Sequence, residues 1–435
     1  MPPKPEELFH TASQHLFVAG VGDVAERLSA LNMTFGLAKI LHYQHSRGVR
    51  PDALFIGAPD TTVTRNTNRW LQGMGYGGIL QWGGEFSVLD TKPNGCGVLM
   101  GRLPKPLSRE AVREKWTAVQ REGLKVDAQA IQWDLTTGNH FLELLRPSEK
   151  EISWDLPWRG PVFLIHSSGK EYRSETPLGP GLYWDRSRRL QELMTRHSTP
   201  WGDLLVLEGK EAEAYTRHCA EVHLFQMRRR ETLAKALLGE FEVLFHGTHQ
   251  GMASPGTAVL GCYKFGPKKH PHMIQGPEVE SYPTVCPLTL RVDLPVSLME
   301  PLPNFTTEAM EALGWSEAAK RLPSSQRLQQ AHILPHGGGT AYPYLETPWA
   351  RQKDGTRRFG ACVKSNLDHR KDPLSQLQDR SNIQFSVDRR EVEFENPRNL
   401  PFSYRGRQVL AKTLQNQMGR ERGRLEILWS LGGEG

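Results

Sequence analysis

The arrangement of apolar and polar residues along the chain predicts four helices. Between Asp23 and His45, apolar side chains recur at the 3.6-residue spacing of an amphipathic helix. Residues 108–122 follow the same spacing, and Ser108 is a candidate N-cap. A long helix is predicted over residues 211–238 and a last one over residues 407–418. The long helix carries Arg217 and Arg228–Arg230, which could form a basic stripe, although most of these arginines are expected to face solvent.

Short apolar runs predict strands at residues 53–57 and 425–429. The glycine-rich segment 73–84 indicates turns or close approach of backbones. Residues 265–287 are predicted as loop with short strands, and residues 366–380 as a loop. Because the chain shows no internal repeat and no clear linker, we expect a single mixed α+β domain.

Composition and charge narrow the class of protein. The chain has 435 residues, of which 38% are hydrophobic and 23% charged, as in soluble globular proteins. No stretch approaches the length of about 20 apolar residues that spans a membrane, and the first residues lack the apolar core of a secretory signal. Five widely spaced cysteines argue against a disulfide framework and favour a cytoplasmic protein. The net charge of +6 gives a mild attraction for phosphates.

Four of the sixteen histidines stand in similar surroundings. His166, His246 and His336 each follow an apolar run directly, and all three, like His140, have small residues beside them. Such positions hold an imidazole rigidly and leave room for a ligand. A single histidine after a strand is more often a hydrogen-bonded structural residue, so the hypothesis of a site rests on the four together.

Cys96 lies between two glycines ahead of an apolar run. A thiolate combined with imidazoles suits zinc, manganese or iron. The alternative is a small buried residue in a turn, and the residues alone favour neither interpretation.

Residues Gly138–Glu143 resemble the Gly-Asn-His-Phe-x-Glu signature of the RtcB family of RNA ligases. Further segments resemble motifs of this family and follow in the family's order. They are Cys96–Val98, His166–Lys170, His246 and His336–Gly338. The resemblance covers roughly residues 50–435, with specific motifs only in patches.

The resemblance implies a fold of one large RtcB-like domain over residues 1–435, with a central cleft for metal and nucleotide. Residues 1–50 would form an N-terminal helical region and residues 51–435 the catalytic core. Cys96, His140, His166 and His246 would bind one or two Mn²⁺ ions. Asn139, Glu143, Gly337 and Gly338 would contact GTP together with His336.

In that family the histidine at the position of His336 attacks GTP and becomes covalently bound to GMP. The guanylate then passes to an RNA 3′-phosphate, and a 5′-hydroxyl displaces it to form the new bond. The implied partners are therefore RNA with 3′-phosphate and 5′-hydroxyl ends and GTP, with an activating helper protein as an optional further partner.

The chain departs from the family pattern at several positions. The family has a metal-binding aspartate where this chain has Pro93, and an arginine where it has Thr340. Gly247 replaces an asparagine, Thr62 a histidine, and Glu434 a lysine near the C-terminus. Asp90 could substitute for the aspartate only if the loop differs. The alternative hypothesis is a paralogue without ligase activity, acting as a metal-dependent phosphoesterase or a nucleic-acid end-binding protein.

Overall fold

The computed structural model describes residues 3–135, 137–148, 156–265, 285–322, 325–353, 356–365, 383–386, 388 and 390–432. The structure is 33% helical and 34% strand, which agrees with the expected mixture of helix and sheet. The predicted loops at 265–287 and 366–380 lie largely outside the described residues, as does Glu434.

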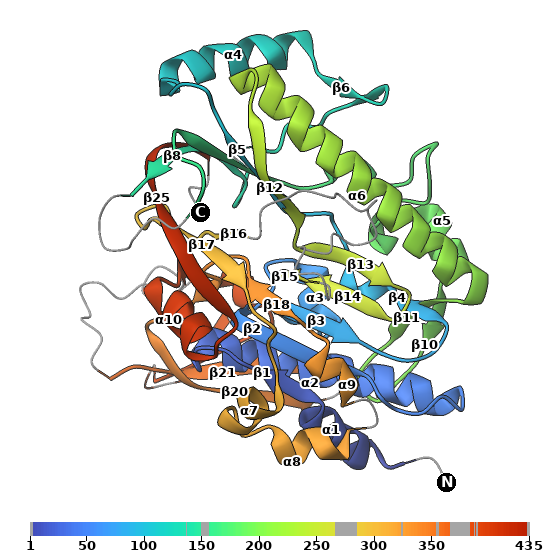
Figure 1. The fold of residues 1–435 in the computed structure, drawn as a ribbon. Coiled ribbons are helices and arrows are strands. Elements are labelled where there is room, and N and C mark those ends of the chain that lie inside the picture. The colour runs from blue at the N-terminus through green and yellow to red at the C-terminus, as the bar shows by residue number, and fades with distance from the viewer. Residues whose placement is uncertain are drawn as a thin grey trace.

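A seven-stranded antiparallel sheet forms one half of the framework (Figure 1). Its order is β12-β5-β9-β8-β25-β17-β16. These strands span Glu242–Thr248, Gly97–Arg102, Val162–Ser167, Phe141–Pro147, Gly419–Gly432, Val296–Pro301 and Cys286–Leu288, respectively. Because β5, β9 and β8 are direct neighbours, residues at their ends are brought together.

A five-stranded sheet forms the other half. Its order is β1 (Leu16–Val18), β2 (Leu54–Thr62), β3 (Tyr76–Gln81), β14 (Thr257–Leu260) and β13 (Gln250–Ser254). Helix α2 (Val24–Ser46) packs on β2, and α1 (Pro5–Gln14) packs on α2. The smaller helices are α3 (Thr67–Leu71), α5 (Arg188–Leu193), α7 (Thr307–Ala312), α8 (Ser316–Arg321), α9 (Gln326–Gln329) and α10 (Arg407–Gln415).

Helix α6 (Gly209–Leu238) runs diagonally along one side of the molecule, and α4 (Arg109–Glu122) crosses its end (Figure 1). The apolar side chains of α6 pack against those of the seven-stranded sheet in one buried cluster, which includes Leu99, Phe163, Ile165, Leu233 and Leu237. Arg217 and Arg228 are exposed, but Arg229 and Arg230 are fully buried, so no continuous basic stripe faces solvent.

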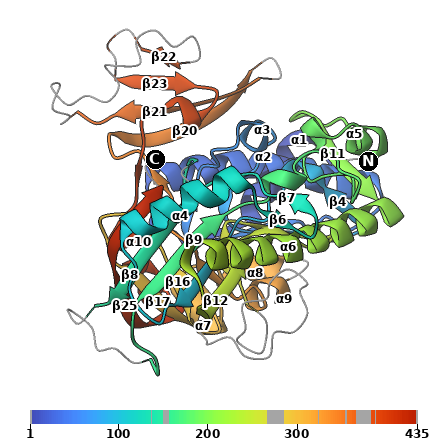
Figure 2. The ribbon, with the colours of Figure 1, turned by 90° about the horizontal axis from the view of Figure 1, so that it is seen from above.

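A four-stranded antiparallel sheet stands at one edge of the molecule (Figure 2). Its order is β20 (Leu345–Lys353), β21 (Thr356–Val363), β23 (Glu391–Phe394) and β22 (Ile383–Phe385). The remaining pairings are short. They are β10 (Thr195–His197), β11 (Leu204–Glu208) and β4 (Phe86–Val88), then β15 (Cys262–Lys264) with β18 (Ile333–Pro335), β19 (Thr340–Ala341) with β24 (Ser403–Tyr404), and β6 (Lys125–Val126) with β7 (Gln129–Ala130).

The helix predictions are confirmed over most of their lengths. Ser108 caps α4, and its hydroxyl accepts a hydrogen bond from the Ala111 amide at 3.2 Å. Helix α2 spans the predicted residues but is buried on nearly all sides rather than on one face. Even Lys39 is fully buried, and its ammonium group lies 3.5 Å from the Asp90 carboxylate. The last helix, α10, ends at Gln415, three residues before the predicted end.

One predicted strand is longer than expected, and one glycine-rich segment contains a strand that was not predicted. The predicted strand at 425–429 is part of the 14-residue β25, whose polar residues belong to a strand paired on both sides. The glycine-rich segment 73–84, predicted to form turns or a close approach of backbones, contains β3. A Cβ atom at Gly78 would lie 2.3 Å from the Ile56 carbonyl oxygen, so this glycine marks a close contact with β2.

No helix in the described part of the chain has the length and apolar character needed to cross a membrane.

The packing of α6 predicts a strong effect of Leu237→Ala. Leu237 is fully buried, so its truncation leaves a cavity and should destabilise the protein by about 2–5 kcal/mol in urea unfolding. Leu193→Ala is the matched control, because that leucine is 44% exposed. Equal urea midpoints for the two variants would contradict this view of the core.

Candidate metal and nucleophile site

A cavity of about 650 Å³ lies where the ends of the two large sheets meet, and it is lined by Cys96, His140, His166, His249 and His336. Four of these residues come from the seven-stranded sheet or the turns that adjoin it, and His336 follows β18. The cavity therefore joins residues separated by as many as 240 positions in the sequence.

Cys96, His140 and His166 form a compact buried group. One ligand atom from each lies within 4.8 Å of the others, and Cys96 Sγ is 3.6 Å from His140 Nε2. Their exposures are only 5–6%. Within the described part of the chain, this is the one group of three or more such side chains with that spacing.

The strand register explains why these three residues meet. Cys96 immediately precedes β5 and His140 immediately precedes β8, while His166 lies in β9 between them. In the sheet, His166 is paired with Val98 on one side and Phe141 on the other. The three functional side chains therefore gather at one end of three adjacent strands.

Hydrogen-bond partners orient the two imidazoles. His166 Nδ1 lies 2.8 Å from the Asn139 carbonyl oxygen, which can only accept, so the proton is on Nδ1 and Nε2 is free. His140 Nδ1 lies 2.9 Å from Asp134 Oδ2, which fixes the same tautomer. A carboxylate or carbonyl behind each histidine is the usual support of a metal ligand.

A buried arginine holds Asp134 in place. Arg229 of α6 donates to Asp134 Oδ1 at 2.7 Å and to Glu171 Oε1 at 2.8 Å. The Ser168 amide donates to the other oxygen of Asp134 at 2.9 Å. Burial alone would raise the pKa of Asp134, but the hydrogen bond from His140 and the charge of Arg229 hold it well below its usual value. The carboxylate therefore stays charged.

The contacts within the group also shift the pKa values of Cys96 and His140. Burial opposes ionisation of Cys96, but hydrogen bonds with His140, His166 and His249 outweigh it and lower the pKa of the thiol well below its usual value. Burial opposes protonation of His140 as well, yet Asp134 and Cys96 raise its pKa to about 9. A thiolate is the form of cysteine that binds metals, and a cation bound here would displace the proton that His140 Nε2 shares with Cys96.

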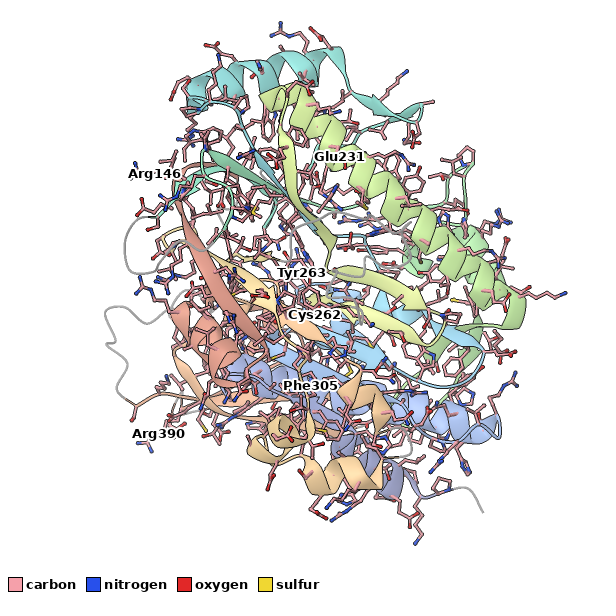
Figure 3. All side chains as sticks on the ribbon, viewed as in Figure 1. Arg146, Glu231, Cys262, Tyr263, Phe305 and Arg390 are labelled. Carbon is pink, nitrogen blue, oxygen red and sulfur yellow. The ribbon has the colours of Figure 1, made fainter. Side chains whose placement is uncertain are left out.

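The structure does not bring His246, expected as the fourth ligand, to this group. His246 lies in β12 and faces α6, where its Nε2 accepts from Arg230 at 3.0 Å and its Nδ1 lies 3.2 Å from Glu231 Oε1. Figure 3 labels Glu231 on α6. Both ring nitrogens are thus occupied, and burial lowers the pKa of His246 to about 4.

His249 lies beside the group instead. Its Nε2 is 3.3 Å from His166 Nε2, and its ring centroid is 4.3 Å from that of His336. One feature of the sequence could have indicated His249 rather than His246 as the residue beside the group. Gln250 follows His249 and supplies a side-chain amide, as the family's asparagine does after its third histidine, whereas Gly247 follows His246.

His336 faces a buried carboxylate that the sequence analysis did not assign to it. His336 Nδ1 lies 2.8 Å from Asp60 Oδ2, and the backbone amides of His336 and Gly337 donate to the same oxygen at 3.0 and 3.3 Å. Asp60 is 1% exposed. A carboxylate beside Nδ1 favours the tautomer with the proton on that nitrogen, in which Nε2 keeps its lone pair.

The glycines after His336 are required by close packing. A Cβ atom at Gly338 would lie 2.5 Å from the Arg405 carbonyl oxygen. Gly339 has φ +69°, and a Cβ there would lie 2.7 Å from the Asp60 carbonyl oxygen. The glycine run therefore lets the loop fold tightly over Asp60.

The other residues expected to contact a nucleotide also line the cavity. Asn139, Glu143, Gly337 and Gly338 are all part of its wall. Burial raises the pKa of Glu143 to about 7, against the opposing hydrogen bond from Ser430. The lining is strongly basic, with Arg65, Arg69, Lys92, Lys170, Arg173, Arg186, Arg291 and Arg398 against only Glu143 and Asp185.

The structure shows what surrounds the positions that depart from the family pattern. Pro93 supplies no ligand, and Asp90 is fully buried against Lys39 and the Leu205 amide, so it does not replace the missing aspartate. Thr340 and Thr62 line the cavity, and the Thr62 hydroxyl donates to the Thr340 carbonyl at 2.8 Å.

A comparison of the chain with models of known protein families found no match. A comparison with curated proteins found none either.

The geometry predicts which histidine supports metal binding. Cys96→Ser should reduce bound Mn²⁺, because it removes a donor atom of the group, and His249→Ala should reduce it too, because it removes the further donor that stands beside the group. His246→Ala should leave metal content close to that of the unchanged protein, because His246 faces α6. Elemental analysis after dialysis against Mn²⁺ measures the content. Loss of metal from His246→Ala with retention in His249→Ala would contradict the arrangement described.

Proposed function

We propose that this protein joins RNA ends by nucleotidyl transfer through His336, with a divalent metal held by Cys96, His140 and His166. One observation carries the proposal. A histidine with a free Nε2 and a carboxylate behind it lies in the same basic cavity as a buried thiolate–imidazole group. This combination matches what the resemblance to RtcB ligases implies.

The residues present fit a metal ion. The thiolate and the two Nε2 atoms converge, the opposite nitrogen of each imidazole is occupied by Asp134 or Asn139, and His249 stands beside them as a further donor. Mixed sulfur and nitrogen donors favour manganese over magnesium. When bound, the cation would offset negative charge that develops on a phosphate in the cavity.

His336 is suited to act as the nucleophile on GTP. Its Nε2 would form a bond to the α-phosphorus as pyrophosphate leaves, giving a covalent phosphoramidate. During the attack the ring gains positive charge, and the buried Asp60 beside Nδ1 stabilises that charge. The imidazole can thus be a nucleophile without a separate base at Nε2.

The cationic lining suits the remaining steps. The guanylate would pass from His336 Nε2 to an oxygen of an RNA 3′-phosphate, and a 5′-hydroxyl would then form the phosphodiester as GMP leaves. Both steps bring several phosphates into one cavity. The eight lysines and arginines that line it would balance their charge.

Covalent labelling tests the nucleophile. Incubation with Mn²⁺ and GTP labelled at the α-phosphate should leave label on the protein, and His336→Ala should abolish it. Asp60→Asn should reduce the labelling rate by ~100-fold, the scale on which removal of a charge-stabilising partner acts. No adduct with GTP or ATP in the unchanged protein would reject nucleotidyl transfer and favour the end-binding or phosphoesterase alternative.

The raised pKa of Glu143 predicts that guanine binding depends on pH. A carboxylate accepts hydrogen bonds from the guanine N–H groups, and the protonated acid accepts them less well. With a pKa of about 7, Glu143 is mostly protonated at pH 6 and mostly ionised at pH 8. Guanosine affinity should therefore rise by about tenfold from pH 6 to pH 8.

Calorimetric titration with guanosine measures this effect, because the base itself does not titrate in that range. Glu143→Gln should remove the pH dependence. An unchanged slope in that variant would show that Glu143 does not contact the base.

A further inference from the structure

The rim of the cavity on the His336 side carries arginines interleaved with aromatic rings. Arg65, Arg398 and Tyr404 belong to the cavity wall. The Arg65 guanidinium lies 3.8 Å from the centroid of the Phe402 ring, and the Phe402 and Tyr404 rings are 5.6 Å apart at nearly right angles. We call these four residues the shelf.

The shelf is attached to the segments that hold the nucleophile. Tyr404 in β24 pairs with Thr340 in β19, which directly follows the glycine run after His336. The Arg405 amide donates to the Gly339 carbonyl at 3.1 Å. On the other side, Arg65 comes five residues after Asp60, just beyond the end of β2. A ligand on the shelf would therefore be held at a fixed position relative to His336.

Exposure and charge make the shelf accessible to a large anion. Arg65 and Arg398 are exposed, and Phe402 and Tyr404 are half-buried. Aromatic faces and guanidinium planes stack on unpaired bases, while the arginine charges attract phosphates. A double helix would not present its base faces to such a surface, so the chemistry fits a single strand.

The shelf differs from the site expected for the mononucleotide. Asn139 immediately precedes the start of β8 and Glu143 lies in β8, within the seven-stranded sheet, whereas the shelf consists of Tyr404 in β24, Arg398 and Phe402 shortly before it, and Arg65 after β2. The shelf is therefore made of other residues than those expected to contact the guanine base.

We propose that the shelf binds the single-stranded RNA nucleotides that adjoin the end reacting at His336. That the bound RNA end reacts at His336 rests on the function proposed above. The binding of RNA to the shelf, in contrast, is measurable without GTP or metal. Failure of ligation and failure of the shelf are therefore distinguishable.

Fluorescence anisotropy with a labelled 12-nucleotide RNA carrying a 3′-phosphate tests the proposal on the full chain. Tyr404→Leu should weaken binding by about tenfold, because it removes a stacking face. Arg65→Gln and Arg398→Gln should each lower the slope of log affinity against log salt by about 0.7, the value for one phosphate contact on a single strand.

Two further variants separate stacking and charge from general damage. Arg65→Lys keeps the charge and loses the planar stack, so it should keep the salt slope of the unchanged protein while binding less tightly. Arg390→Gln is the matched control, since Arg390 is an exposed arginine at the outer edge of the molecule (Figure 3). It should leave both affinity and slope unchanged.

The proposal is overturned if the unchanged protein binds this RNA no better than a duplex of the same length. It is also overturned if the shelf variants and Arg390→Gln have the same affinity and slope. Shelf-dependent RNA binding by a protein that forms no GTP adduct would support the shelf and reject the ligase. A DNA strand of the same sequence shows whether the 2′-hydroxyl contributes.

Discussion

The buried contact between Arg229 and Asp134 is the interaction on which the site depends. Two fully buried charged groups are costly unless each is closely paired, and here Arg229 meets two carboxylates while Asp134 meets Arg229, His140 and the Ser168 amide. The contact ties α6 to the loop before β8 and to the end of β9. It therefore fixes the orientation of His140, and with it the geometry of the Cys96 group.

A second buried carboxylate, Asp60, orients His336, the proposed nucleophile. Asp60 binds the side chain and the backbone of the His336 loop, and the glycines that follow allow that loop to lie against it. The two supported histidines then open into one cavity whose wall is rich in arginine and lysine. Fixed cations around a free imidazole and a thiolate–imidazole group form a coherent environment for phosphoryl chemistry, and the shelf extends it toward the surface.

The sequence predicted features that depend on local patterns. Helices α2, α4 and α6 were recognisable from their apolar spacing, and Cys96, His140, His166 and His336 were recognisable from strand ends and motifs. The partners behind them could not be found in this way, because Arg229 and Asp60 meet their targets across 95 and 276 residues. The choice between His246 and His249 also required the fold, since the pleat of β12 turns His246 toward α6.

We propose that Cys96, His140 and His166 hold a metal ion within reach of His336. Anomalous diffraction from crystals soaked in Mn²⁺ tests this claim most directly. We expect a strong peak between Cys96 Sγ and the Nε2 atoms of His140 and His166, on the side toward His249. A peak beside His246 and Glu231, or no peak among these residues at saturating Mn²⁺, would contradict it.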